Sequence, residues 1–496
     1  MAIAELMPFC VLVPLIAAPV CALLPGRVWP WALALAAAAA SAAIAALTLP
    51  AAMGAPLSYA FGNWPPPIGI EYRVDAANAF VALLVAGMAV VTLPWAKTSV
   101  DAEVPERQGT FYALFLLAFA GLMGITLTGD AFNVFVFLEI SSLATYALIA
   151  HGPDRRALLA AFRYLIMGTV GATFLLIGIG FLYMMTGTLN MADLAERLPA
   201  VRETNTVRAA LAFIIVGMGL KLALLPLHLW LPNAYTYAPN FITVFVAGTA
   251  TKVALYVMLR FVFTVFAPDY SFAVLPLALV LMVLAIAGMF AGSWVAMFQA
   301  NLKRMLAYSS VAQVGYMVLG ISLVSVTGIT AAFLHLFNHA LMKGALFMAL
   351  GTMIYRVGSA RIEAVRGLGR VMPWTLTAFA LAGLSIIGVP TTAGFISKWY
   401  LILAAMEAGH WWLVMLIVIT SLMAVYYIWR VVEAAWFQSR PDGAPAVAEA
   451  PLSLLAPTWL LVALNFYFGL DTRLTVSAAT AAAEALLGPV AGGARP

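Results

Sequence analysis

The sequence predicts an all-α polytopic membrane protein of about fourteen transmembrane helices, with two inverted five-helix repeats that each contain a broken helix. Three observations lead to this prediction: the apolar composition, the recurrence of long apolar segments, and helix breakers at matching places in the two halves. Of the 496 residues, 65% are hydrophobic and 9% are charged, and the mean hydropathy is +1.02. Soluble domains carry about 25% charged residues, so we expect the lipid bilayer to be the solvent of this chain.

Long apolar segments set the expected number of helices. A helix needs roughly 20 apolar residues, with a rise of about 1.5 Å each, to cross the hydrocarbon core of a bilayer. The segments that meet this condition are 5–24, 29–49, 77–97, 111–128, 130–151, 159–186, 208–231, 239–263, 272–298, 304–325, 328–354, 371–403, 411–435 and 452–472.

The fourth to eighth segments are echoed by the ninth to thirteenth. Each partner begins roughly 160–175 residues later in the chain, and because five is odd, the second set runs in the opposite direction across the membrane. Inverted repeats of this kind are typical of secondary transporters. We therefore divide the chain into N-terminal helices (1–110), a first repeat (111–270), a second repeat (271–440), and a C-terminal helix with a tail (441–496).

Helix breakers interrupt the fourth member of each set. The breakers are Pro226 and Pro232 in the first set and Gly388, Pro390 and Gly394 in the second. A proline removes an amide donor and frees a carbonyl, which a membrane tolerates only where protein or water satisfies it. A plain proline kink is the alternative, but Lys221 precedes the first break and Lys398 follows the second. A lysine beside each break favours a functional site.

The distribution of Lys and Arg predicts the orientation. With the N-terminus outside, thirteen of these residues fall in cytoplasmic loops and about seven outside, Arg495 in the tail among them, as the positive-inside rule requires. An even number of helices then places both termini outside, in a bacterial-type plasma (inner) membrane. The net charge of +5 is spread through short loops rather than gathered in one patch, so we expect no binding of nucleic acid.

Ionisable side chains inside the apolar segments are the candidate functional residues, because a buried charge is costly in a membrane. Glu139 is the only carboxylate well inside a segment, and a buried salt bridge that locks two helices is its structural alternative. Lys221, Lys252 and Lys343 also lie well inside, whereas snorkelling to the interface is plausible for Lys398. Burial disfavours a charged ammonium and a nearby carboxylate restores it. A lysine whose carboxylate partner can move away is therefore a proton switch.

His335, His339 and Lys343 recur every four residues and therefore share one helix face. The histidines have the spacing of paired metal ligands, but the sequence offers no acidic neighbour and no third ligand, so we predict no metal site. Two histidines and a lysine in an otherwise apolar helix fit a proton relay better.

Redox chemistry within this chain is not predicted. Cys10 and Cys21 both fall in the first apolar segment and are the only cysteines, so no iron–sulfur or zinc pattern exists. The sequence contains no dinucleotide or phosphate-binding motif either. We expect no bound cofactor and no catalytic chemistry of its own in this chain.

The ionisable residues form a lateral polar axis if they lie at one membrane depth. In chain order they are Glu139, Lys221, Lys252, His335, His339, Lys343 and Lys398. Neighbouring charges along such an axis would be coupled, because a proton brought to one lysine repels charge on the next.

Six stretches around these residues resemble the motifs of a known family. They match its fifth, seventh, eighth, tenth, eleventh and twelfth helices and run over residues 128–139, 221–232, 251–253, 301–317, 335–343 and 390–398. The family comprises antiporter-like subunits of respiratory complex I, the large subunits of Mrp-type Na⁺/H⁺ antiporters, and subunits of membrane-bound hydrogenases. Within it the chain most resembles the D-type subunits of Mrp antiporters, notably at 62–70 and 186–195.

The resemblance implies a proton-translocating subunit of a multisubunit monovalent cation/proton antiporter, with other membrane subunits as partners and Na⁺ or K⁺ as the exchanged ion. Glu139 and Lys221 would be the ion pair whose opening gates transfer, Lys252 and the histidines the central relay, and Lys398 the distal site. The alternative is a proton-pumping subunit of a complex I-like NADH:quinone oxidoreductase or membrane-bound hydrogenase, with the redox chemistry in other chains.

Overall fold

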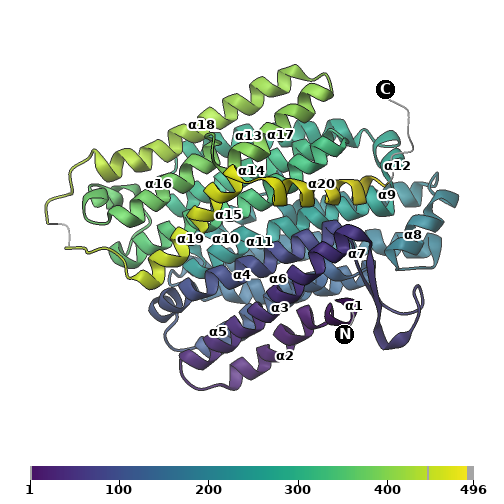
Figure 1. Ribbon diagram of the computed structural model, residues 1–496, viewed down its shortest axis with the longest axis horizontal. Coiled ribbons are helices and arrows are strands. Elements are labelled where there is room, and N and C mark those ends of the chain that lie inside the picture. Colours follow the sequence, from purple (N-terminus) through teal and green to yellow (C-terminus); the bar gives the residue numbers. More distant parts are fainter. Residues whose placement is uncertain (1–2, 444–445, 489–496) are drawn as a thin grey trace.

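The computed structural model describes residues 3–443 and 446–488 and shows a bundle of long helices that run along a common direction (Figure 1). Within this part of the chain, thirteen helices are long and apolar enough to cross a membrane. α16 (Pro373–Ile387) and α17 (Ala393–Glu407) have 15 residues each and follow one another across a break. A fourteenth candidate is the bent pair of Ile362–Arg370 and α16, if it forms one span, so the prediction of about fourteen is confirmed. Arg495 of the predicted tail lies outside the described residues.

The other long helices follow the predicted segments closely, and several begin at side-chain caps. Asp130 caps α6 by accepting the amide of Asn133 at 2.7 Å, and Asn301 caps α14 in the same way. The remaining bounds are α1 Ile3–Leu6, α2 Phe9–Leu23, α3 Val28–Gly54, α4 Ala76–Glu103, α5 Gln108–Leu127, α6 Ala131–Ala150, α7 Arg156–Thr186, α9 Asn205–Leu222, α10 Trp230–Tyr237, α11 Asn240–Leu259, α13 Leu277–Met297, α14 Leu302–Ser322, α15 Val326–Val357, α18 Trp411–Trp436 and α19 Leu452–Leu470.

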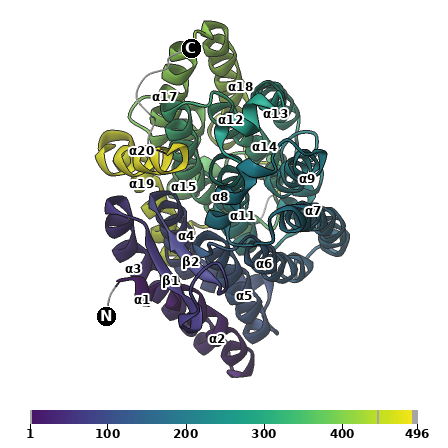
Figure 2. The same ribbon diagram turned by 90° about the vertical axis from the view of Figure 1, so that its right-hand side faces the viewer.

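Short elements gather at one end of the bundle (Figures 1 and 2). They are the antiparallel hairpin of β1 (Leu57–Ala60) and β2 (Glu71–Val74), α8 (Met191–Arg197) and α12 (Pro268–Ala273). We call this the hairpin end and the opposite one the far end. The first and last described residues both lie at the hairpin end (Figure 1).

The two five-helix sets pack alike. In the first set α5 contacts α6, α6 contacts α7, α7 contacts α9, α9 contacts α11, and α11 returns to α5. In the second set α13, α14, α15, the α16–α17 pair and α18 make the same sequence of contacts, and α18 returns to α13. α11 packs on α15 and so joins the two sets. This equal packing supports the predicted repeat.

One helix of the predicted tail was missed. α19 is followed by α20 (Arg473–Leu487), which packs on α4 and α15. Its 15 residues bury a face rich in alanine, including Ala478, Ala479 and Ala482. A segment this short and this weakly apolar does not meet the length condition for a membrane span, so the sequence pattern did not reveal it.

Candidate functional site

The first helix break begins before its prolines. α9 ends at Leu222, and Ala223 turns the chain with a φ of +60°. The carbonyl of Leu220 accepts from the indole of Trp230 at 2.8 Å and from the amide of Ala223 at 3.2 Å, so this backbone group next to the break is satisfied. Pro226 lies in the linker, whereas Pro232, also predicted as a breaker, lies in the first turn of α10, where a missing amide is tolerated.

Lys221 occupies the last turn of α9 and faces Glu139 on α6. Its Nζ lies 3.8 Å from Oε1 of Glu139, and the two side chains are 6% and 23% exposed. The same ammonium donates to the hydroxyl of Ser142 at 2.8 Å and to that of Tyr146 at 3.4 Å. Lys221 therefore has a charged partner at ion-pair distance and neutral partners at hydrogen-bond distance. Such an arrangement lets the ammonium move between them.

A small cavity of about 30 Å³ lies between Lys221 and α11. Ser142, Tyr164 and Ala250 are among its lining residues, and its volume is large enough for about one water molecule. No hydrogen bond joins Lys221 to Lys252 within the described ranges. A proton passing between these lysines would therefore need water in the cavity.

Lys252 is fully buried near the middle of α11. Its Nζ donates to the carbonyl of Ala247 and lies 3.4 Å from the hydroxyl of Thr251. No carboxylate forms an ion pair with it in the part of the chain that the structure describes. α11 packs on α15, the helix that carries His335, His339 and Lys343, so Lys252 lies on the helix that joins the two repeats.

α15 places both histidines and Lys343 on one buried face, as predicted. The two imidazole rings stack with centroids 6.1 Å apart and an interplanar angle of 8°. His335 lies 2.9 Å from both Ser397 and Gln313, one at each ring nitrogen. Neither nitrogen of His339 has a hydrogen-bond partner among the described residues. No group of three or more His, Cys, Asp or Glu there could hold a metal ion, and the absence of a metal stays a prediction.

Lys398 stands just after the second break and is buried, with 5% exposure, so it does not snorkel. Its Nζ donates to the carbonyls of Ile386 and Ile387 at 3.0 and 2.9 Å and to Ser421 at 2.9 Å. These carbonyls end α16, where the helix dipole is negative. Gly388 turns the chain there with a φ of +90°.

The two other predicted breakers of this region differ in position. Pro390 lies in the linker, whereas Gly394 lies in the first turn of α17. A Cβ on Gly394 would meet the carbonyl oxygen of Ser385 at 1.8 Å. The role of Gly394 is therefore to let the two half-helices approach, rather than to break a helix.

Sequence reasoning missed a polar stripe on α14. Ser309 accepts from the ammonium of Lys343, as does the carbonyl of Leu306 at 2.7 Å. Gln313 contacts His335, and the ring of Tyr316 lies 4.8 Å from Nζ of Lys398. Residues 306, 309, 313 and 316 share one helix face, so α14 contacts each predicted proton-transfer residue of the second repeat except His339. All three lie in the stretch 301–317 that resembles the family's tenth helix, but neutral Ser, Gln and Tyr are common in such helices, and they were not singled out as functional residues.

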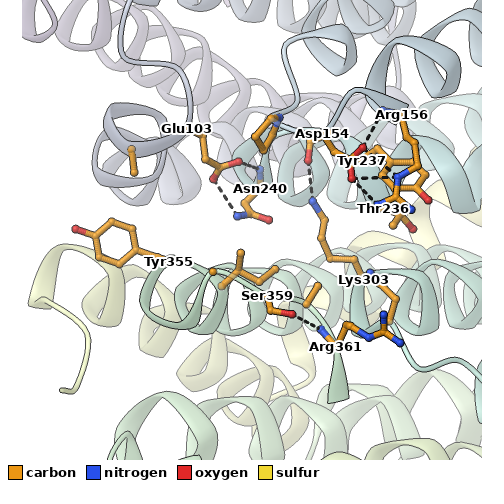
Figure 3. Close-up of a pocket in the computed structure, with 17 residues that line it drawn as sticks. Glu103, Asp154, Arg156, Thr236, Tyr237, Asn240, Lys303, Tyr355, Ser359 and Arg361 are labelled. Carbon is orange, nitrogen blue, oxygen red and sulfur yellow. Dashed lines mark hydrogen bonds and ion pairs between the residues drawn. The ribbon is translucent and has the colours of Figure 1, made fainter. Parts of the chain in front are cut away.

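A polar pocket of about 490 Å³ opens at the far end of the bundle (Figure 3). Lys303, buried in the first turn of α14, donates to the carbonyl of Ala238 at 2.7 Å. Glu103, at the end of α4, accepts from the amide and the side chain of Asn240, both at 2.9 Å. On the rim, hydrogen bonds from Arg156 lower the pKa of Asp154 to about 2, so its charge is fixed. Opposite charges therefore line a cavity at the start of α11.

The predicted axis thus has two parts. Glu139 and Lys221 form a pair in the first repeat, and the other five residues lie on α11, α15 and α17 (Lys252, His335, His339, Lys343 and Lys398). All seven are buried or partly buried within the bundle. Buried ionisable groups of this kind mark ion pathways in membrane proteins, and proton transfer along these seven stays a prediction.

Comparison with known proteins agrees with this geometry. A family model described as NADH:quinone oxidoreductase/Mrp antiporter, TM, matches residues 128–424. The N subunit of the NADH-quinone oxidoreductase of Desulforudis audaxviator is 46% identical over 428 residues, covering 84% of this chain and 85% of the relative. The D subunit of the Na⁺/H⁺ antiporter of Bacillus subtilis is 31% identical over 437 residues, covering 87% and 86%.

A solved structure is similar over nearly its whole length. A chain of the Mrp complex from Dietzia sp. DQ12-45-1b superposes with a TM-score of 0.90 at 27% identity, covering 99% of this chain and 98% of that one. Sequence, fold and the buried lysine–histidine series lead to one conclusion: this multi-pass membrane protein belongs to the family of NADH:quinone oxidoreductase and Mrp antiporter membrane subunits.

Proposed function

We propose that this chain is the proton-translocating subunit of a multisubunit Na⁺ or K⁺/proton antiporter. The observation that carries the proposal is the series of buried ammonium and imidazole groups from Lys221 to Lys398. A role in structural ion pairs does not explain this series, because Lys252, Lys343 and Lys398 have only neutral hydrogen-bond partners among the described residues. Charged groups buried in this way are expensive in a membrane and mark ion pathways.

Proton transfer would begin at the far-end pocket. Glu103, Asn240 and Lys303 line it at the start of α11, twelve residues before Lys252. The count of Lys and Arg in the loops supports a cytoplasmic position for this end. The hairpin end, with the first and last described residues, would then lie outside a bacterial-type inner membrane.

Gating would occur at Glu139 and Lys221. With the pair closed, the carboxylate holds the ammonium in its charged form. If Lys221 and Glu139 move apart while Lys221 keeps its bonds to Ser142 and Tyr146, the carboxylate no longer stabilises its charge, and the proton can leave toward Lys252. The arrival of charge at Lys252 repels protons on His339 and Lys343, which drives transfer onward to Lys398.

A second function has its own support. The 46% identity to the N subunit of an NADH-quinone oxidoreductase favours a redox-driven pump, in which other chains carry the cofactors and this chain carries only protons. In both cases the partners are other membrane subunits and the bilayer. The two functions differ in the energy source, since an antiporter uses a gradient of Na⁺ or K⁺.

The test is proton flux in everted vesicles that contain the whole complex, followed with a pH-sensitive dye. Na⁺ or K⁺ is added to one sample and NADH to another, with wild type and Lys221→Ala compared. A pH change evoked by the cation and lost in the variant establishes antiport. Flux that requires NADH establishes the redox-driven function. Normal transport by an assembled Lys221→Ala complex contradicts both.

A further inference from the structure

An apolar cavity of about 230 Å³ lies where α4, α15, α19 and α20 meet. In Figure 1, α19 and α20 are the yellow helices that follow one another along the bundle, and both pack on α4. Each of the four helices contributes apolar side chains to the cavity wall, among them Phe80, Leu341, Leu461 and Ala478. None of the seven predicted proton-transfer residues lines it, so the proposed function does not account for this space.

Water is not a suitable occupant of the cavity. A buried water molecule needs about two to four polar partners, and Thr475 is the only polar side chain among the lining residues that the structure describes. Its hydroxyl already donates to the carbonyl of Thr472 at 3.2 Å. Apolar cavities of about 150 Å³ stay dry and bind small apolar molecules. The chemistry of the wall therefore selects an apolar ligand.

The cavity is elongated along the helices. Phe80, Leu84, Gly87 and Val91 of α4 line it, and their spacing places them on one helix face over about three turns. At a rise of about 1.5 Å per residue, this face is about 16 Å long. One leaflet of a bilayer has a hydrocarbon layer of about 15 Å, half of the about 30 Å core. The length and direction of the cavity therefore match one extended lipid chain.

The cavity opens to the outer surface of the bundle between α4 and α19. Its lining residues Val91 and Leu464 are half-buried, whereas Leu84 and Met88 behind them are buried. Gly87 is also half-buried, and a Cβ on it would meet no atom within 4 Å, so this glycine leaves the opening free. Outside a transmembrane bundle the solvent is lipid hydrocarbon. Lipid chains therefore have direct access to the cavity.

The position of the cavity along α4 indicates which leaflet supplies the chain. α4 begins at Ala76, next to the β hairpin, and ends at Glu103 in the far-end pocket. The lining residues of this helix run from Phe80 to Val91, chiefly in the half nearer the hairpin end. A chain that reaches them comes from the leaflet at that end.

Met88 connects the cavity to the helices of the proton-transfer residues. It lines the cavity and is 2% exposed. A Cβ on Gly248 of α11, or on Gly344 of α15, would lie 2.8 Å from its terminal methyl carbon, so the end of this side chain lies between the two helices. An occupant of the cavity therefore contacts a residue that packs on both the helix of Lys252 and the helix of Lys343.

We propose that this cavity is a binding site for one hydrocarbon chain of a membrane phospholipid from the hairpin-end leaflet. The chain enters between α4 and α19, lies along the face of α4 that carries Leu84 and Gly87, and reaches Met88, while the headgroup stays at the membrane surface. Dispersion contacts with the wall hold it. The site goes beyond the proposed function, because it requires neither antiport nor redox coupling.

A side chain of a neighbouring subunit is the competing occupant. It would enter by the same opening, but from one point, and would fill only part of an elongated cavity. A lipid chain fills the whole length and is present wherever the opening faces the bilayer. The two occupants differ in whether a lipid probe can reach the buried wall in the assembled complex.

The experiment uses the whole complex, reconstituted in phosphatidylcholine vesicles that contain a phosphatidylcholine with a photoactivatable diazirine in the middle of one chain. After illumination, peptide mass spectrometry locates the label. Met88 and Leu341 are the residues to follow, because they line the cavity and are only 2% and 4% exposed. A chain that stays on the outer surface cannot reach them. We expect both to be labelled in the wild type, and neither by a probe with the diazirine in its headgroup.

Gly87→Leu places a side chain in the cavity and should abolish the label on Met88 and Leu341. Leucine is a better helix former than glycine, so α4 is retained. Gly180→Leu is the matched control, because Gly180 is a helical glycine on the exposed face of α7, away from the cavity, and a Cβ on it would also meet no atom within 4 Å. This control should be labelled as the wild type is, and the total label per complex should be the same in all three.

Each outcome decides for or against the site. An assembled wild-type complex without label on Met88 and Leu341 overturns the proposal, and loss of assembly in Gly87→Leu on a native gel would then identify a neighbouring subunit as the occupant. Label that persists in an assembled Gly87→Leu complex overturns it equally. If wild type is labelled and Gly87→Leu does not assemble, Val91→Phe narrows the opening instead, and undiminished label in that variant contradicts the site.

Lys221→Ala tests the proposed function separately in the same vesicles. This variant should stop proton transport and leave the label on Met88 and Leu341 unchanged, because Lys221 does not line the cavity. Lost label with intact transport in Gly87→Leu supports the lipid site alone. Normal transport by Lys221→Ala contradicts the proposed function and leaves the result of the labelling in force.

Discussion

Lys398 lies against Gly388 across the second helix break, so that a Cβ on the glycine would come within 2.9 Å of the lysine Cδ. The glycine also holds a φ of +90°. This contact keeps the ammonium on the carbonyls that end α16. The position of the distal relay group therefore depends on the absence of a side chain at residue 388.

Gly388→Ala should move the Lys398 ammonium and lower proton flux. Alanine in a left-handed conformation also costs about 1–2 kcal/mol of stability. Gly358→Ala is the matched control, because Gly358 has a φ of +71° and open space around its Cα. We expect both variants to lose thermal stability to a similar degree and only Gly388→Ala to lose flux per assembled complex. Equal flux in the two variants would show that Lys398 does not depend on this contact.

Glu139→Gln should abolish transport while the complex still assembles. Glutamine has nearly the same shape but no charge, so Lys221 loses the partner that stabilises its ammonium form and keeps only Ser142 and Tyr146. Glu407→Gln removes an exposed carboxylate at the end of α17 and should transport as wild type does. If the first variant transports normally, the salt bridge is structural and the gate lies elsewhere.

Ser309→Ala should impair transport and Ser310→Ala should not. Both hydroxyls are buried neighbours on α14, but only that of Ser309 accepts from Lys343, whereas that of Ser310 bonds the backbone of its own helix. A hydrogen bond to a charged group contributes about 1.5–3 kcal/mol, which corresponds to about a tenfold or larger change in the protonation equilibrium. Dye-monitored proton flux across a pH series measures this change in the protonation equilibrium. Identical pH profiles for the two variants would show that α14 takes no part in proton transfer.

Lys303→Met should slow proton uptake from the far-end pocket. The change removes an ammonium from the pocket wall and places an apolar side chain beside Glu103 and Asn240 (Figure 3). Arg361→Met is its control, since Arg361 lies on the rim and pairs with Glu363 while both are largely exposed, and such pairs contribute little. Stopped-flow uptake rates should separate the two variants, and equal rates would place the inlet outside this pocket.

Much of the fold could be predicted because apolar length alone decides where a chain crosses a bilayer. The predicted segments, the five-helix sets and both broken helices are present. α20 was missed because fifteen residues with small buried alanines carry too weak a signal. The site was predicted at its ionisable members, since a lysine such as Lys252 in an apolar helix is rare enough to be conspicuous.

The rest of the site depends on contacts that sequence spacing does not encode. Ser309 and Gln313 are ordinary polar residues until the fold places Lys343 and His335 against them. The ion pair between Asp75 and Arg260 joins residues 185 positions apart, each near a helix end where charge is normal. Only tertiary packing brings such residues together. The sequence also predicted the first helix break at Pro226, whereas in the structure the break begins at Ala223.

The middle position of the relay residues has an electrical consequence. Lys252 lies near the centre of the 26-residue span Asn240–Val265, and Lys343 near that of the 32-residue span Val326–Val357. Moving a charge across a membrane involves about 2.3 kcal/mol per 100 mV, but this work depends only on displacement along the membrane normal. Proton transfer between two groups at the middle of their spans would run sideways and be nearly silent to voltage. The membrane potential should then act on this protein where protons enter and leave the bundle.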